Sequence, residues 1–443
     1  MQASDAAIAA RCALVILAAC SDGTPTEALA GSDAGGPAGP TALHPMPAPP
    51  LCRLEMDCQE PIVDDPKVDC SLSVVAGDGQ LQFQGRAGAE VRGRSSQRFP
   101  KLNYAVELRQ PDGTEQPTDL LGMGQEADWI FDGQWADRSM MRSALVFDLY
   151  QGLGGVEHYA AEGRFCELDL DGAPMGIYRL VERVKRAGSR IDIARDDGSG
   201  QRFVIKQDDE GSIRWSTGEQ DHFKLIHPTE LAASEAQRTA IQAWVDQLDR
   251  ALRDGDVQQP GQGVFALLDL DSLVDWVLIE ELSKNIDAYN LSLHFFRGAD
   301  GLGRLVPWDF DLSMGQPNAE VRGARNEAPE GWSRRGWLMI DPLVESELFR
   351  RRLAERWHLH REGPFASQRI EALVDRYLDT LDADAVERNF ELWPIEEVDF
   401  SFIYAPYSFD PVASFGEEVT RLRSWLRQRL AWIDTHIDGF PAE

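Results

Sequence analysis

The stretch from Asn285 to Gly315 (NIDAYNLSLHFFRGADGLGRLVPWDFDLSMG) constrains the fold of this chain most strongly. It holds two apolar runs, 291–296 and 305–308, separated by a glycine-containing turn, and this pattern predicts a β-hairpin. Because antiparallel strands joined by a short turn place their outer ends side by side, we expect the residues flanking the hairpin to meet. The polar residues at these two outer ends are Asp287, Asn290, Asp309 and Asp311.

Carboxylate and amide oxygens of this kind are the ligands that Mg²⁺ takes, usually together with the phosphates of a substrate. The four side chains therefore predict a magnesium site, and the sequence leaves open whether Asp309 or Asp311 holds the metal. The alternative is a strand pair with solvated carboxylates at its ends. The crowding of four polar groups among Trp, Phe and Pro residues favours the site.

A second feature is the turn RGRSSQRFPKLNY, residues 92–104, which is basic in an otherwise acidic chain. Small residues in a turn expose backbone N–H groups and hydroxyls, and neighbouring cations add positive charge, so the turn predicts an anion cradle. The alternative is a basic surface turn that offsets neighbouring acids. The residues concerned are Arg92, Gly93, Arg94, Ser95, Ser96, Arg98 and Lys101.

Charge limits the possible partners. The 443 residues include 74 acidic and 44 basic side chains, a formal net charge of −30. This balance argues against sequence-independent nucleic-acid binding, which needs Lys and Arg to neutralise phosphates. It argues equally against electrostatic docking to an anionic membrane.

The N-terminus is typical of an export signal. Arg11 precedes an apolar run, 12–19, and LAAC at its end resembles the bacterial lipobox, with Cys20 as the lipidated residue. We therefore expect a signal peptide over 1–20, followed by a flexible Gly/Pro/Ala-rich tether over 21–50. The chain would be an exported cell-envelope lipoprotein, facing either the periplasm or the outside. An ordinary secretory signal and a misassigned start codon are the alternatives.

Four cysteines remain after Cys12 and Cys20, and an even number in an exported chain suggests two disulfides. Their connectivity stays open among three possibilities. One pairing makes a local loop from Cys52 to Cys58 and joins Cys70 to Cys166.

Periodicity predicts an α+β chain with a β-rich part over 51–207 and a mainly helical part over 208–443. Alternation on both sides of DGAP predicts a hairpin over 165–184. Ser139 and Gly152 are suited to start and end a helix. Further helices are expected at 234–253, 271–284, 346–360, 367–383 and 414–437.

Charged residues in the β-rich part allow two interpretations. Glu182 and Lys206 each lie at the end of a predicted strand. Both are either active-site groups or surface charges, and as a site group Glu182 would bind the nucleotide. Asp137, Arg138 and Arg142 either orient a phosphate or form a helix cap and a salt bridge.

Five stretches of the sequence, given at the end of this paragraph, resemble the CotH kinase (spore coat protein H) family and follow one another in the order of that family. The resemblance covers residues 90–315 and implies an atypical protein-kinase-like two-lobe fold, with a β-rich N-lobe and a mainly helical C-lobe. The conventional G-x-G-x-x-G loop and H-R-D motif of kinases are both absent. The stretches are RGRSSQRFPKLNYAVEL, DWIFDGQWADRSMMRSALVFDLYQGLG, ELDLDGAPMGIYRLVERV, NIDAYNLSLHFFR and VPWDFDLSMG.

The resemblance also implies roles for individual residues. Lys101 looks like the nucleotide-phosphate lysine, and Asp287 like the aspartate that accepts the hydroxyl proton. Asp309 looks like the metal aspartate, Asn290 like its helper, and Asp311 stands where ordinary kinases have the glycine of DFG. The residues that match the phosphate-side turn of the family are Arg92, Ser95 and Ser96.

The function implied is Mg²⁺-dependent transfer of phosphate from ATP to Ser or Thr of a protein, by an enzyme tethered to the membrane through Cys20. The alternative keeps the fold without catalysis, as a surface lipoprotein that binds a protein or glycan ligand. The Asp, Asn and Lys set favours the kinase. A glycoside hydrolase, which also uses paired carboxylates, leaves the basic turn without a role.

Overall fold

The computed structural model describes residues 49–155, 158–216, 221–321, 324–333, 336–397 and 408–441. These residues belong to one compact unit. The expected signal peptide and nearly all of the tether lie outside the described residues. None of the described helices has the length and apolar character needed to cross a membrane.

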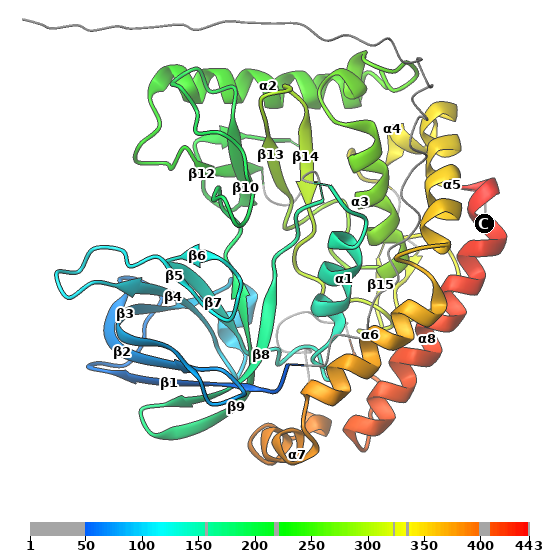
Figure 1. Ribbon diagram of the computed structural model, residues 1–443. Helices are drawn as coiled ribbons and strands as arrows, with labels where there is room; N and C mark the ends of the chain where they lie inside the picture. The colour runs from blue at the N-terminus through cyan, green and yellow to red at the C-terminus, as the bar shows by residue number, and fades with distance from the viewer. Residues whose placement is uncertain are drawn as a thin grey trace, which may run out of the picture. The chain divides into compact units, whose positions relative to one another are not determined.

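Seven strands close a barrel in the order β1-β2-β3-β4-β7-β9-β8 (Figure 1). Neighbours are antiparallel except β1 and β8, which run parallel. Alternate residues of β1, such as Leu54 and Met56, are buried and fill the barrel interior. The strands are β1 (Cys52–Cys58), β2 (Val68–Val75), β3 (Leu81–Arg92), β4 (Asn103–Arg109), β7 (Asp128–Asp132), β8 (Gly163–Leu170) and β9 (Ala173–Glu182).

The two expected disulfides are present, and their pairing is not the one with a local loop from Cys52 to Cys58. Cys52 is bonded to Cys166, and Cys58 to Cys70. Both bridges join residues that are direct partners in the barrel: Cys52 faces Cys166 across β1 and β8, and Cys58 faces Cys70 across β1 and β2. Sequence spacing favoured the local loop, but Cys52 and Cys58 lie at opposite ends of one extended strand and cannot meet.

A second sheet has the strand order β11-β12-β10-β13-β14. Helix α2 (Glu235–Arg253) packs against it through Trp244, which contacts the rings of Phe203 and Phe295. Two short strand pairs complete the β-structure, β5 (Thr118–Asp119) with β6 (Gln125–Glu126) and β15 (Glu320–Val321) with β16 (Ala324–Arg325). The sheet strands are β10 (Phe203–Asp208), β11 (Ile213–Arg214), β12 (His222–His227), β13 (His294–Arg297) and β14 (Gly303–Val306).

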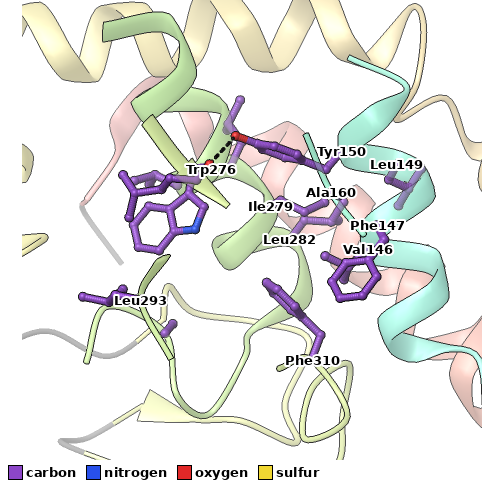
Figure 2. Close-up of a cluster of buried hydrophobic side chains, with 14 of the residues drawn as sticks. Val146, Phe147, Leu149, Tyr150, Ala160, Trp276, Ile279, Leu282, Leu293 and Phe310 are labelled. Carbon is purple, nitrogen blue, oxygen red and sulfur yellow. Dashed lines mark hydrogen bonds between the residues drawn. The ribbon is translucent and has the colours of Figure 1, made fainter. Parts of the chain in front are cut away.

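Helix α3 (Leu270–Ser283) is the centre of the helical part, because its side chains from Ser272 to Ser283 are all buried. Figure 2 shows side chains of α3 facing those of α1 (Arg142–Gln151), with Phe310 reaching into the same cluster. The other helices are α4 (Asp341–Val344), α5 (Glu347–Arg361), α6 (Ser367–Thr380), α7 (Ala383–Leu392) and α8 (Phe415–His436). The 3-10 turns are 95–98, 263–266, 395–397 and 437–439.

The α+β class is confirmed, and the β-rich part is a closed barrel; the two-lobe kinase arrangement and the boundary at residue 207 stay predictions. The hairpin over 165–184 forms with a two-residue turn, Asp171–Gly172, both at positive φ (52° and 74°). The expected helix over 367–383 ends at Thr380. A separate helix, α7, begins there because the carboxylate of Asp382 caps its first N–H groups.

Candidate functional site

The hairpin of β13 and β14 brings its two flanking loops together. Its register pairs His294 with Val306, so the segments before β13 and after β14 leave the sheet side by side. The backbone N–H of Ile286 donates to the carbonyl of Leu312 at 3.1 Å. The hydroxyl of Ser292 donates to Oδ2 of Asp309 at 2.7 Å.

Backbone strain concentrates in these loops. Tyr289, Ser292 and Asp309 are non-glycine residues in the left-handed region, with φ of 67°, 56° and 71°. Phe310 is fully buried against Phe147, which fixes the loop that carries the aspartates on either side of it. A strained conformation held by a buried anchor is characteristic of functional sites.

Negative charge accumulates around Asp311. Burial raises the pKa of its carboxyl well above the ordinary value, and the carboxylates of Asp309, Asp132, Asp137 and Asp287 raise it further. Burial also raises the pKa of Asp309, although this side chain is open to solvent; the Ser292 hydroxyl acts in the opposite direction. A cation at this point would therefore be bound favourably.

Asp132, at the end of β7, is a site residue that sequence reasoning did not single out. Its charge acts on Asp309 and Asp311, and it also raises the pKa of the cations Arg92 and Lys101. The signal was present in the sequence, because Asp132 ends an apolar run and precedes a glycine. This is the pattern expected of a side chain delivered by a strand end.

Arg92 is the cation that faces this cluster. It is the last residue of β3, and its guanidinium lies 5.6 Å from the ring centre of Trp308. Burial lowers its pKa, whereas Asp132 and Asp309 raise it. Among the described residues, none accepts a hydrogen bond from its guanidinium. Arg92 therefore combines a held position with unused N–H donors, as an anion site requires.

The turn after Arg92 has the expected compact form. Ser95–Arg98 make a 3-10 turn, and Gly93 has a φ of 107°. A Cβ on Gly93 would lie 1.9 Å from Oγ of Ser96, so only glycine fits. Ser95 and Ser96 are partly exposed beside Arg92, and their role toward phosphate stays a prediction.

Lys101 is buried, with 2% of its surface exposed. Its ammonium donates to the carbonyl of Ile177 at 2.5 Å and to Oδ1 of Asn389, on α7, at 2.8 Å. Burial lowers its pKa to about 7, and Asp132 opposes this. The structure thus shows Lys101 joining the barrel to α7; its contact with nucleotide phosphate stays a prediction.

Glu182 lies away from the aspartate cluster. Its Oε2 accepts hydrogen bonds from the Tyr159 hydroxyl at 3.2 Å and the Glu162 N–H at 3.1 Å. Burial raises its pKa to about 7. No described contact joins it to the nucleotide-side residues, so its role in binding stays a prediction. Lys206 is partly exposed and pairs with Asp208 at 2.7 Å.

Asp137 and Arg142 form a helix cap and a salt bridge, the second of the two alternatives that the sequence left open for them. Asp137 accepts from the backbone N–H of Arg142 at 2.7 Å and from its guanidinium at 2.5 Å, so α1 begins at Arg142 and not at Ser139. Arg142 also donates to the carbonyl of Ser313 at 2.9 Å and to Glu418 of α8 at 2.7 Å. It thereby fixes the loop that follows Asp311.

The donor set suits a magnesium ion that is held jointly with a substrate. Asn290 is 3% exposed, and its Oδ1 accepts no hydrogen bond from any residue that the structure describes, as expected of an amide directed at a metal. In the described part of the chain, no three His, Cys, Asp or Glu side chains form a group that could hold a metal. Magnesium commonly takes only one or two carboxylates and completes its shell with phosphates and water. The residues therefore fit this metal, and the choice between Asp309 and Asp311 stays open.

A known protein family covers most of this chain. No curated protein matches the chain. The model of the family described as CotH kinase protein matches residues 89–433, which include the barrel from the end of β3, the aspartate cluster and most of α8. Strands β1 and β2 precede the matched region, and β1 carries Cys52 and Cys58, one cysteine of each disulfide. The chain belongs to the CotH kinase protein family.

Proposed function

We propose that this protein is a Mg²⁺-dependent kinase that transfers the terminal phosphate of ATP to a Ser or Thr hydroxyl of a protein. The observation that carries the proposal is the arrangement of Asp287, Asp309 and Asp311 in adjoining loops near Arg92, whose guanidinium has no hydrogen-bond acceptor among the described residues. The aspartates would bind a metal cation, and the arginine beside them would bind an anion. Together they suit a metal–triphosphate complex. Family membership supports the same conclusion.

Each side chain has a distinct task in this proposal. Asp309 or Asp311 would hold the metal with Asn290, and the metal supplies neutralisation of the phosphate charge. Arg92 and the turn at Ser95 and Ser96 would bind and orient the phosphate oxygens. Because Asp309 is exposed, a substrate can reach this cluster from solvent.

Asp287 would be the proton acceptor. It takes the proton of the acceptor hydroxyl as the hydroxyl oxygen bonds to the γ-phosphorus, and the bond from that phosphorus to the β,γ-bridging oxygen breaks. ADP leaves with the electron pair of the broken bond. The backbone N–H of Asp287 donates to Oδ1 of Asn285 at 3.1 Å, which helps to fix the loop.

We further propose that the protein is exported and tethered through a lipid on Cys20. Two disulfides support an oxidising compartment, because such bonds are rare in proteins of the cytosol. The substrate would then be a protein of the cell envelope or beyond it.

The test is phosphate transfer from γ-labelled ATP with Mg²⁺ by the full chain, compared with Asp287→Asn and Asp309→Asn. Both variants keep side-chain size, and Asp112→Asn, in an exposed turn, is the matched control. We expect label with the native and control proteins and a loss of about 10²-fold or more in the two site variants. Nucleotide binding is measured in parallel by calorimetry. If the native protein neither transfers label nor binds nucleotide, the kinase hypothesis is refuted. The alternative is then a lipoprotein that binds a protein or glycan ligand.

A further inference from the structure

A small cavity lies where helix α7 meets the loop that follows β7. Its volume is about 20 Å³, and the residues around it include Lys101, Arg138 and Asn389. A space of this size admits about one water-sized particle. It is lined by side chains from the barrel, from the loop and from α7.

Arg138 is the unusual group in the cavity wall. It is 3% exposed, and within the described part of the chain its Nε and Nη2 have no hydrogen-bond partner. Its guanidinium stacks on Phe409 at 5.0 Å, which does not satisfy these donors. Burial of a charged group with unpaired donors is costly, so a partner that the protein itself does not provide is expected here.

The surrounding ion pairs leave Arg138 as the surplus charge. Asp137 pairs with Arg142 at 2.5 Å. Glu418 pairs with Arg142 at 2.7 Å and with Arg421 at 2.5 Å. These two carboxylates are thus engaged by other guanidinium groups, and no carboxylate of the described residues lies within 4.0 Å of the Arg138 guanidinium. The cluster carries one positive charge without a counter-ion.

A second cation borders the same space. The ammonium of Lys101 has three N–H donors, of which two are used by Ile177 and Asn389. Asp137 also lines the cavity, but Ser139 and Arg142 occupy both of its oxygens. Asp132 acts on Lys101 from outside the cavity wall, so the positive charge in the wall without a paired carboxylate is that of Arg138.

We propose that this cavity binds a single monatomic anion of the size of chloride, held by Arg138 and Lys101. Phosphate and sulfate are too large for the space, so the proposed ligand differs from the nucleotide, although Lys101 is also the residue expected to contact the nucleotide phosphate. A bound water is the competing occupant, because Oε1 of Gln134 also lines the cavity without a partner. Water would leave the charge of Arg138 uncompensated, whereas chloride neutralises it.

The test measures the melting temperature of the full chain in sodium chloride, bromide and gluconate at equal ionic strength. Gluconate is too large for the cavity and is the matched control salt. We expect a saturable rise in chloride and bromide alone, since a ligand that binds only the folded state stabilises it. Arg138→Gln should lose the response, and Arg351→Gln, at an exposed arginine of α5, should keep it. Equal responses to all three salts would overturn the proposal.

Crystals of the native protein grown in bromide provide a reading that does not depend on any variant. Bromide scatters anomalously, so a peak between Arg138 and Lys101 would confirm the anion directly. Density without anomalous signal at that position would identify water and refute the proposal. Neither measurement requires kinase activity, so the result stands whether or not the proposed function is correct.

Discussion

Replacing Lys101 by Met tests the electrostatics of the barrel–α7 junction. The folded protein holds the pKa of this lysine at about 7 instead of its ordinary 10.5, because burial disfavours the ammonium. Each pKa unit of difference between folded and unfolded states is worth about 1.4 kcal/mol, so the charged lysine costs up to about 5 kcal/mol. Hydrogen bonds from the ammonium to Ile177 and Asn389 favour the charged form, so we expect a cost of about 2–5 kcal/mol.

The sign of the pH dependence follows from proton binding. Between pH 7 and 10.5 the unfolded state binds more protons at Lys101 than the folded state does, so the native protein gains stability as pH rises. Below pH 7 the lysine is charged in both states, and the full cost remains. Lys101→Met lacks this group, so its stability advantage over the native protein should be largest below pH 7 and shrink toward pH 10.

Urea unfolding of both proteins at several pH values, about 6 to 10, measures this difference. Lys284, whose pKa is also lowered to about 7, is present in both proteins and cancels in the comparison. Lys224→Met, at an exposed lysine, is the matched control and should follow the native curve. A constant difference between the native protein and Lys101→Met across this pH range would refute the reasoning.

Three further perturbations have definite expected outcomes. Arg142→Met leaves two buried carboxylates without their shared partner, so urea unfolding should show a loss of about 3–5 kcal/mol; a loss below about 1 kcal/mol would contradict this. Removing the Cys52–Cys166 bridge with a pair of serines opens a connection of 114 residues, which should lower the free energy of unfolding by about 4–5 kcal/mol in the same assay. Ser292→Ala removes a hydroxyl donor, so the pKa of Asp309 should rise; carboxyl ¹³C NMR titration measures it, and an unchanged value would argue against the hydrogen bond.

The parts of the fold that depend on local pattern were predictable from sequence. The strands β13 and β14 and the helix α2 follow from hydrophobic periodicity, and Ser234 begins α2 with a complete capping box. The meeting of Asp309 with the loop before β13 also follows, since a hairpin fixes which ends are neighbours. These features require no knowledge of distant contacts.

Long-range features were not predictable in the same way. The barrel closes through parallel pairing of β1 with β8, and no local pattern in β1 specifies that partner. The disulfide pairing therefore stayed open at the level of sequence, because it follows the barrel register and not the sequence spacing. Asn389, which binds Lys101, lies on α7, a helix that was not expected because the predicted one ended at residue 383. The surroundings of Lys101 consequently could not be read from the turn in which it occurs.

The segment from Asp132 to Arg138 contributes to both the acidic cluster around Asp311 and the cavity lined by Arg138 and Lys101. Asp132 and Asp137 act on Asp311, where negative charge is in excess, while Arg138 lines the cavity where positive charge is in excess. An anion beside Arg138 and Lys101 would offset two cations on which Asp137 and Asp132 act, and so strengthen the negative potential at Asp311. We therefore expect chloride to increase magnesium affinity, and magnesium to increase chloride affinity by the same factor, because coupling between two sites is reciprocal. Magnesium titrations in chloride and in gluconate measure this factor, and equal affinities in the two salts would show that the two sites are independent.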